Sequence, residues 1–307
     1  MSARSFEDAM GLLTRNGQPL DPVAGGRLLE TLAHEGDARA AERLAVVSGA
    51  GFGRAVDWEA ALRWLGAAAE GGYELARKQL RLLTGRSDLE DWNSASRSVD
   101  IDAWAGARPI RTVVGSPRVE VAASFMDAAC CAWVMERAAP LQTAATVYNP
   151  SNAQGMQHDT RTNTVALFTI ASLDVPTLLI RERISNTAGV PVTNLERFNV
   201  LRYLPGQRFA DHVDFLDPAM FEREIAERGQ RVATFLVYLN QDYQEGETSF
   251  SRIQKGFRGR TGDALLFRNV DAQGQPDRLT LHEGRPPVGG EKWLLSQFIR
   301  DKAQATG

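Results

Sequence analysis

Cysteine and histidine are scarce in this 307-residue chain. The two cysteines, Cys130 and Cys131, are adjacent, and adjacent cysteines rarely bridge each other. A disulfide framework and a multi-cysteine zinc or iron–sulfur site are therefore excluded. The four histidines are His34, His158, His212 and His282. Any histidine-based metal site must draw on these few candidates.

An excess of charge of one sign and long apolar runs are also missing. Lys and Arg total 35 against 38 Asp and Glu, which argues against a protein built to neutralise nucleic-acid phosphates. Residues 1–20 contain no apolar signal-peptide core. The most apolar stretch, Val165 to Ile180, is interrupted by Asp174 and Pro176 and is too short to span a bilayer. We therefore expect a cytoplasmic protein with neither a nucleic-acid nor a membrane partner.

The first 85 residues repeat themselves with a shift of 36. The matching pairs are Asp21 and Asp57, Arg27 and Arg63, Leu29 and Leu65, Ala33 and Ala69, Gly36 and Gly72, Ala40 and Ala76, and Leu44 and Leu80. A period of this length is typical of stacked helix pairs, and Gly36 and Gly72 fall where each first helix should end. The segment from Trp58 to Leu80 resembles a Sel1-like repeat, a relative of the tetratricopeptide repeat. An ordinary helical hairpin bundle is the alternative interpretation.

The helical repeat pattern ends after residue 85. Residues 86–110 are polar, rich in Ser and Asp, and without a clean period, which predicts a linker. Trp92 and Trp104 within it would nevertheless be unfavourable in water. A helix is expected from Met126 to Ala139. Short β-branched and aromatic runs between turns then predict strands, in the order TVALFTI, TLLIRERI, FNVLRYL, VATFLVYLN, DALLFRNV and KWLLSQFIR.

These patterns predict an α+β chain with two structural domains. Residues 1–85 should form an α-helical repeat region, followed by the linker over 86–110. Residues 111–307 should form a double-sheet β-domain of the jelly-roll kind.

The sharpest chemical feature is the pair His212 and Asp214. Positions two apart on a strand face the same side, so both side chains can turn toward one point. The natural third ligand is His282, just after the strand-like RLTL, because His34 lies in the repeat and His158 in a polar loop. Two histidines and a carboxylate form the facial triad of non-haem Fe(II) oxygenases. The HxD pattern alone would also fit a surface histidine bonded to its neighbour.

Lys292 adds a second observation. The residues before it should turn the chain, so that Lys292 opens the final strand and shares one face with Leu294, Ser296 and Phe298. A lysine among apolar neighbours is unfavourable unless it meets an anion, such as the far carboxylate of a dicarboxylic cosubstrate. A solvated lysine at a strand end is the alternative.

Several ordered motifs resemble the catalytic domain of the prolyl 4-hydroxylase family: RYLPGQRFADHVDF, GQRVATFLVYLN, EGETSF, GDALLF and HEGRPPVGGEKW. The likeness runs over about residues 115 to 300 and includes HDTRTNTVALF and LERFNVLRY upstream. It implies an Fe(II)- and 2-oxoglutarate-dependent dioxygenase on a double-stranded β-helix (jelly roll). Such an enzyme uses O₂ to hydroxylate a C–H bond while 2-oxoglutarate becomes succinate and CO₂. Ascorbate is a candidate reductant.

The resemblance also implies roles for the residues that bind metal and cosubstrate. His212, Asp214 and His282 match the iron ligands. Lys292 matches the basic residue that binds the distal carboxylate of 2-oxoglutarate. Two further matches on the cosubstrate side are Tyr203, which would hydrogen-bond 2-oxoglutarate, and Thr248, which would line the pocket.

On the substrate side, Arg231 matches an arginine that contacts substrate in some members of the family. Phe209 stands where the family often has a tyrosine, so a hydroxyl group is missing there. The charged segment after Asp214 predicts a short helix from Pro218 to Arg228, either a solvated loop or a lid over the substrate.

Three functions follow from these features. The first is a hydroxylase acting on a prolyl or other amino-acid, peptide or protein substrate. The second is a catalytically inactive scaffold whose repeats bind a partner protein. The third is a zinc hydrolase using the same triad, with Glu283 as its acid or base. The repeats could recruit a protein, mediate an oligomer, or serve stability.

Overall fold

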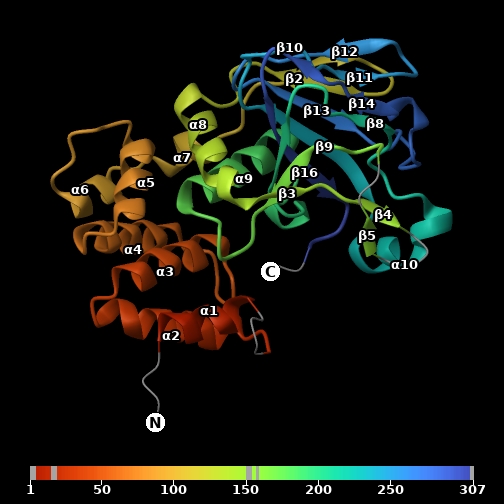
Figure 1. The fold of residues 1–307 in the computed structure, drawn as a ribbon. Helices are drawn as coiled ribbons and strands as arrows, with labels where there is room; N and C mark the ends of the chain where they lie inside the picture. Colours follow the sequence, from red (N-terminus) through yellow and green to blue (C-terminus); the bar gives the residue numbers. More distant parts are fainter. Residues whose placement is uncertain (1–4, 15–18, 150–153, 157–158, 305–307) are drawn as a thin grey trace. The chain divides into compact units, whose positions relative to one another are not determined.

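The computed structural model describes residues 5–14, 19–149, 154–156 and 159–304 (Figure 1). These residues form two compact units. One contains the described residues up to Gly106 together with Thr169–Arg183, and the other those of Ala107–Phe168 and from Ile184 onward. Within the described chain, no helix combines the length and apolarity that crossing a membrane requires. His158, predicted to lie in a polar loop, falls outside the described residues.

The first unit is helical, as the sequence predicts. Its helices before Gly106 are α1 (Phe6–Thr14), α2 (Pro22–His34), α3 (Ala38–Ala50), α4 (Trp58–Glu70), α5 (Glu74–Thr84), α6 (Trp92–Arg97) and α7 (Ile101–Ala105). Aspartates cap many of them: side-chain oxygens accept hydrogen bonds from first-turn N–H groups at Asp21, Asp37, Asp57, Asp91 and Asp100. Each cap satisfies a donor that the start of a helix leaves without a partner.

The internal shift of the sequence reappears in the helix boundaries. Helices α4 and α5 begin 36 residues after α2 and α3. Gly36 and Gly72 follow the first helix of each pair with φ values of 95° and 85°. This left-handed backbone is unfavourable for residues with a Cβ atom, so glycine permits the turn into the next helix. The predicted ends of both first helices are confirmed.

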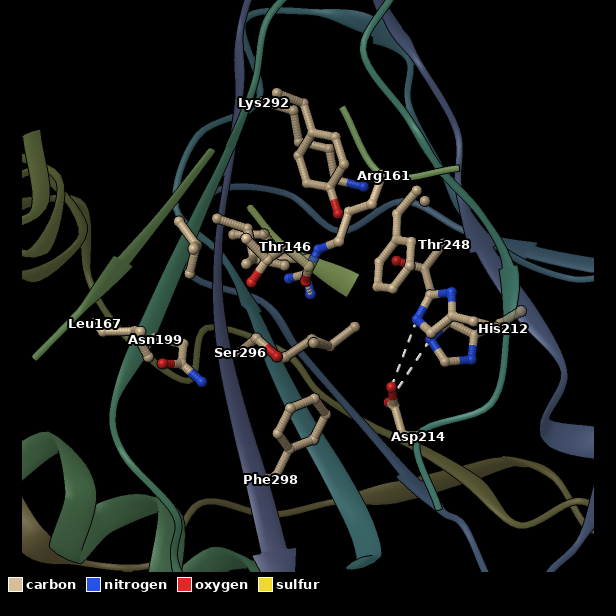
Figure 2. A pocket seen from close by; sticks show the side chains of 18 residues that line it. Thr146, Arg161, Leu167, Asn199, His212, Asp214, Thr248, Lys292, Ser296 and Phe298 are labelled. Atoms are coloured by element: carbon tan, nitrogen blue, oxygen red, sulfur yellow. Dashed lines mark hydrogen bonds and ion pairs between the residues drawn. The ribbon is translucent and has the colours of Figure 1, made fainter. Parts of the chain in front are cut away.

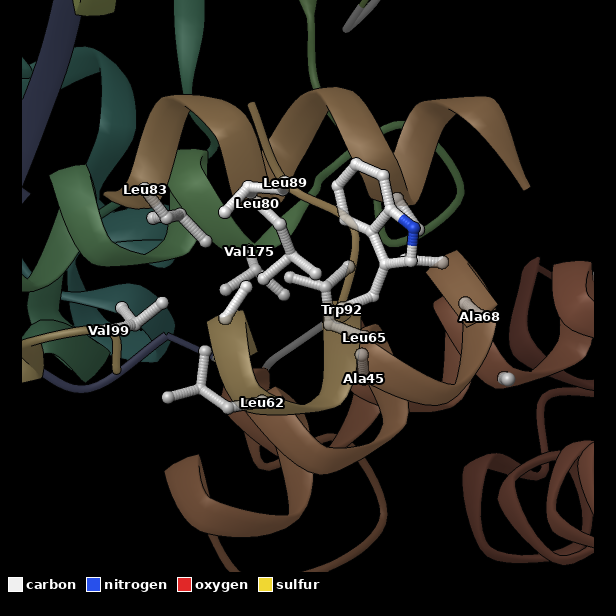
Figure 3. Close-up of a cluster of buried hydrophobic side chains, with 14 of the residues drawn as sticks. Ala45, Leu62, Leu65, Ala68, Leu80, Leu83, Leu89, Trp92, Val99 and Val175 are labelled. Carbon is white, nitrogen blue, oxygen red and sulfur yellow. The ribbon is translucent and has the colours of Figure 1, made fainter. Parts of the chain in front are cut away.

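The prediction of a linker over 86–110 is wrong for most of its length. Helices α6 and α7 occupy this segment, and Trp92 is buried in a cluster with Leu65 and Leu80 (Figure 3). The indole Nε1–H of Trp104 donates to the Leu83 carbonyl at 2.9 Å. The two indole rings supply enough apolar surface to pack a segment whose other residues are polar.

A second correction concerns the run TLLIRERI, predicted to be a strand. It lies inside α9 (Val175–Ala188). The helix begins with a reciprocal cap, in which Thr177 N–H donates to Asp174 Oδ1 and Asp174 N–H donates to Thr177 Oγ1, both at 2.9 Å. Pro176 stands in the first turn, where a missing N–H costs nothing. A short apolar run cannot be assigned by periodicity alone, and here the cap decides it.

The second unit is built on antiparallel sheets. The larger has eight strands in the order β1-β2-β13-β9-β16-β7-β6-β3, and a four-stranded sheet has the order β12-β11-β14-β8. Strands of the larger sheet are β1 (Arg111–Val114), β2 (Val119–Ala122), β3 (Gln142–Ala144), β6 (Thr164–Leu167), β7 (Asn199–Tyr203), β9 (Arg231–Tyr238), β13 (Ala264–Arg268) and β16 (Lys292–Arg300). Those of the smaller are β8 (Phe209–His212), β11 (Thr248–Phe250), β12 (Lys255–Phe257) and β14 (His282–Gly284). Two further ribbons pair β4 (Val147–Asn149) with β5 (Gln154–Met156) and β10 (Gln244–Glu245) with β15 (Pro287–Val288).

Residues of both larger sheets meet in one hydrophobic core. Phe250 of the four-stranded sheet packs with Leu236, Phe267 and Leu294 of the eight-stranded sheet. The predicted helix after Met126 is α8 (Ala128–Ala138), and α10 (Pro218–Arg228) has the predicted bounds. The five remaining predicted strands are β6, β7, β9, β13 and β16. The run RLTL is not a strand but a 3₁₀ turn over Arg278–Thr280.

Candidate active site

The structure brings His212, Asp214 and His282 together, although 70 residues separate the two histidines. His212 ends β8 and His282 begins β14, and the two are directly paired across these antiparallel strands. Asp214 lies in the bend that follows β8 rather than on the strand. The candidate ligand atoms of all three lie within 4.8 Å of one another, and Figure 2 shows Asp214 facing the imidazoles.

Backbone carbonyls orient both imidazole rings. Nδ1 of His212 lies 2.8 Å from the Ala210 carbonyl oxygen, and Nδ1 of His282 lies 2.9 Å from that of Thr280. A carbonyl can only accept, so Nδ1 carries the proton in the neutral ring and Nε2 keeps its lone pair. The Nε2 atoms lie 3.5 Å and 3.7 Å from the Asp214 carboxylate. Two lone pairs and one carboxylate thus converge on one point.

The protonation states suit a metal site. Burial, and then the neighbouring His212, lower the pKa of His282 to about 4, so this ring is neutral near pH 7. Burial by itself would raise the pKa of Asp214, but the two histidines and a hydrogen bond from Thr234 hold that pKa well below its usual range. Neutral imidazoles and an ionised carboxylate are the forms that bind a divalent cation.

A short hydrogen-bonded chain supports the carboxylate from behind. The Thr234 hydroxyl donates to Asp214 Oδ2 at 2.7 Å, and Asn269 Nδ2 donates to that hydroxyl oxygen at 3.0 Å. Both residues are buried. Hydrogen-bonded partners of this kind fix the orientation of a ligand and tune its affinity for metal. Sequence reasoning missed this pair, because Thr234 lies in β9 and Asn269 in the bend after β13, and the two form no motif.

A cavity of about 180 Å³ extends from these residues along the inner face of β16. Lys292, Leu294, Ser296 and Phe298 all line it, which confirms the shared face predicted from the sequence. Lys292 is fully buried, and its Nζ donates to the Gly246 carbonyl at 2.7 Å. Burial lowers the pKa of this ammonium to about 7. The ring centroids of Tyr203 and Tyr238 lie 5.1 Å and 6.0 Å from Nζ, and the charge of Glu247 opposes part of the effect of burial on the Lys292 pKa.

Tyr203 and Thr248 also line the cavity. Tyr203 pairs with Lys292 across β7 and β16. A Cβ atom at Gly284 would lie 3.0 Å from the Tyr203 hydroxyl, so a residue without a side chain leaves room for that phenol. The hydroxyl of Tyr238 donates to the Phe257 carbonyl at 2.8 Å, and the Thr248 hydroxyl donates to the Tyr238 oxygen at 3.2 Å, which fixes the threonine in the wall.

Phe209 lies beside the metal-binding residues. Its ring stacks on His212, with centroids 3.5 Å apart and planes inclined by 14°. The guanidinium of Arg161 covers this phenyl ring at 4.4 Å. Arg161 lines the cavity and has no carboxylate partner among the described residues. It was not singled out from the sequence, although the HDTRTNTVALF motif contains it.

Two residues named from the sequence do not line the cavity. Arg231 forms a two-pronged ion pair with Glu196 at 2.7 Å and 3.0 Å. Glu283 follows His282 on β14, and its carboxylate accepts from Arg285 at 2.8 Å. A zinc hydrolase would need an acid or base beside its metal, and among the described lining residues Asp214 is the one carboxylate. The zinc hydrolase alternative therefore loses the residue on which it depended.

Comparison with known proteins agrees with this geometry. Residues 198–300 match the 2OG-Fe(II) oxygenase superfamily. The chain is 30% identical over 253 residues to prolyl 4-hydroxylase 1 of Arabidopsis thaliana, covering 76% of this chain and 88% of that protein. A putative prolyl 4-hydroxylase of Acanthamoeba polyphaga mimivirus is 36% identical over 126 residues, which covers 40% of this chain and 52% of that protein.

Among solved structures, the viral collagen prolyl hydroxylase of Paramecium Bursaria Chlorella virus-1, as its 2OG complex, has a TM-score of 0.44 and 23% identity. The match covers 59% of this chain and 95% of the viral protein. The length and identity of the Arabidopsis match assign the family. The chain belongs to the prolyl 4-hydroxylase family of the 2OG-Fe(II) oxygenases and is an Fe(II)- and 2-oxoglutarate-dependent dioxygenase.

Proposed function

We propose that this enzyme hydroxylates a prolyl residue or a similar amino-acid residue, with His212, Asp214 and His282 as the iron ligands. The supporting observation is that these three side chains and the Lys292 ammonium face one cavity. Bound iron, with 2-oxoglutarate and O₂, supplies the oxidation: one oxygen atom enters a substrate C–H bond and the other enters succinate, with release of CO₂. The relatives' names supply the prolyl substrate class.

In this proposal, one part of the cavity binds 2-oxoglutarate and another part binds the substrate. Lys292, at the start of β16, would bind the distal carboxylate of 2-oxoglutarate. The carboxylate would replace the lost hydration of the buried ammonium and so favour its charged form. Tyr203, paired with Lys292, would hydrogen-bond the same carboxylate, and Thr248 would complete this wall. Leu294 and Leu236, which also line the cavity, would keep water away from the reacting atoms.

Two other lining residues would meet the substrate: Phe298, farther along β16 from Lys292, and Arg161, which lies over Phe209. Arg161 offers guanidinium N–H groups without a carboxylate to hold them, and a substrate carbonyl oxygen can accept from them. Phe209 would contribute an apolar surface where the family often has a tyrosine. We propose that Arg231 does not contact the substrate but holds the Phe298 ring in place, because its guanidinium stacks on that ring at 4.0 Å.

The N-terminal helices have a function that is separate from the chemistry. We propose that α2–α5 are two Sel1-like repeats that stabilise an internal segment. Arg43 and Gln79 lie 36 residues apart at equivalent positions, and both bind that segment. Arg43 Nη1 donates to the carbonyls of Ile170 and Ala171 at 3.2 Å and 3.0 Å, and the Val175 N–H donates to Gln79 Oε1 at 3.0 Å. Recruitment of a protein partner through these helices, oligomer formation, a cytoplasmic location and ascorbate as reductant stay predictions.

The proposed reaction is tested in two steps. Purified enzyme with Fe(II) and 2-oxoglutarate should release succinate, and His212→Ala or Asp214→Ala should abolish that release. A library of proline-containing peptides and free amino acids is then searched by mass spectrometry for the gain of one oxygen atom. Iron-dependent succinate release without any oxygen gain in prolyl substrates would overturn the substrate assignment. Metal binding without succinate release would favour the inactive scaffold.

The role of the repeats has its own test. Replacing Arg43 by Met leaves the buried Glu42 carboxylate without its ion-pair partner, which lies 2.5 Å away. Breaking a buried pair in this way costs about 3–5 kcal/mol of unfolding free energy. The matched control is Arg39→Met on the same helix, because Arg39 pairs with Glu7 on the surface. Equal loss of stability in the two variants, measured by urea unfolding, would contradict the proposal.

A further inference from the structure

A buried ionic cluster lies at the end of β16 opposite to Lys292. The side chain of Arg300 is fully buried, and each of its three guanidinium nitrogens has a partner. Nε donates to Glu196 at 2.5 Å, Nη2 to Glu224 at 2.6 Å, and Nη1 to the Gly229 carbonyl at 2.7 Å. Arg300 therefore connects β16 to Glu224 in the last two turns of α10 and to Gly229, the residue that follows the helix.

The same cluster reaches the wall of the cavity. Glu196 is shared with Arg231, whose guanidinium covers the Phe298 ring at 4.0 Å. Phe298 of β16 lines the cavity. It is paired with Thr234 of the neighbouring strand β9, whose hydroxyl donates to Asp214. A change at Arg300 is thus three contacts away from Phe298 in the cavity wall, through Glu196 and Arg231.

Helix α10 depends on this cluster because it has little packing of its own. It contains no buried residue, and its backbone departs from helical geometry at Phe221, with φ −123° and ψ 27°. Hydrogen bonds at its C-terminal end include those from Lys302 Nζ to the Ala226 carbonyl and from Gln304 Nε2 to the Arg228 carbonyl. Apolar burial contributes little to holding the helix, so polar contacts attach it, and among them the ion pair of Glu224 with Arg300 is the one to a fully buried side chain.

Helix α10 supplies one of the two carboxylates that face the buried guanidinium groups of the cluster. Arg231 and Arg300 share Glu196, and Arg300 also pairs with Glu224, which lies 3.9 Å from the half-exposed Arg228 of its own helix. If α10 moved away, Glu196 would be left between two arginines and one buried positive charge would be uncompensated. Leaving a buried charge unpaired is strongly unfavourable. A helix attached in this way resists opening.

We propose that Arg300 is a positioning residue for the substrate side of the active site. It anchors α10 through Glu224 and holds Arg231 against Phe298 through Glu196. Helix α10 is then held fixed to β16 and is not the moving lid that the sequence left open. This inference rests on the proposed function only for the identity of the substrate, since the anchoring itself is independent of the reaction.

The test uses full-length Glu224→Ala with Glu227→Ala as its matched control. Both positions lie on α10, but Glu227 pairs with the exposed Arg223, which is its one ion-pair partner among the described residues. Hydrogen exchange of residues 218–228 is measured by mass spectrometry, and KM is measured for a ten-residue polyproline peptide and for 2-oxoglutarate. Glu224→Ala should exchange faster over α10 and raise the peptide KM by about tenfold, equivalent to about 1.4 kcal/mol. Its KM for 2-oxoglutarate should match the control, because Lys292 lies at the other end of β16.

A second variant tests Arg300 directly. Arg300→Lys keeps the charge but cannot span both carboxylates, so it should change exchange and peptide KM in the same direction. If Glu224→Ala and Glu227→Ala are alike in exchange, the anchor is refuted. If exchange rises while the peptide KM stays unchanged, the positioning role is refuted. If wild-type enzyme releases no succinate at all, the proposed function fails, whereas the exchange comparison still decides whether Glu224 anchors α10.

Discussion

Replacing Lys292 by Met should weaken 2-oxoglutarate binding and at the same time stabilise the ligand-free protein. The side chain keeps its length and its apolar stem but loses the buried ammonium. Truncating one partner of a buried charge pair costs about 2–5 kcal/mol, which corresponds to a rise of about 30- to 5,000-fold in the KM for 2-oxoglutarate.

The gain in stability follows from the same burial. The pKa of Lys292 falls from 10.5 to about 7 in the folded protein, at 1.36 kcal/mol per pKa unit. The charged form therefore destabilises the fold by up to about 5 kcal/mol below pH 7, and this penalty disappears as pH rises toward 10.5. Between these values the unfolded chain binds more protons, so the stability of the wild type should rise with pH. The Met variant should lack this rise.

Two measurements decide the matter. Urea unfolding at pH 7 and pH 9.5 gives the stability of each protein, and succinate release at varied 2-oxoglutarate concentration gives KM. Iron affinity, measured by titration with a metal indicator, should be equal in the two proteins, because the three metal-binding side chains are untouched. An unchanged KM would remove Lys292 from its role. A Met variant less stable than the wild type at pH 7 would refute the argument from burial.

Three further outcomes are expected. Thr234→Val removes the hydrogen bond to Asp214, and should weaken metal affinity by about 10- to 100-fold in an indicator titration while leaving the fold unchanged by circular dichroism. Gly284→Ala places a methyl group 3.0 Å from the Tyr203 hydroxyl, and should raise the KM for 2-oxoglutarate without loss of metal affinity. Trp92→Ala should lower the unfolding free energy by about 3–5 kcal/mol in urea, and a loss below about 1 kcal/mol would mean that the indole is not a core residue.

Much of the candidate site could be predicted from the sequence. The HxD pair, the later histidine and the lysine opening the last strand are local patterns, and their strand periodicity states which side chains share a face. The helix boundaries at Gly36 and Gly72, and those of α10, are local too, because capping residues and glycine act within one turn. The apolar run in α9 predicts a strand, and this prediction is wrong because the cap formed by Asp174 and Thr177 starts a helix there.

Tertiary structure decided everything that depends on contact between distant strands. Only the register that pairs His212 with His282 brings the two imidazoles to one carboxylate, and no local pattern states that register. Thr234, Arg161 and Arg300 acquire their roles from neighbours far away in the chain, so their sequence surroundings show nothing unusual. The types of side chain needed for the chemistry can be read along the chain. Their distances, burial and protonation states exist only once the sheets have closed around them.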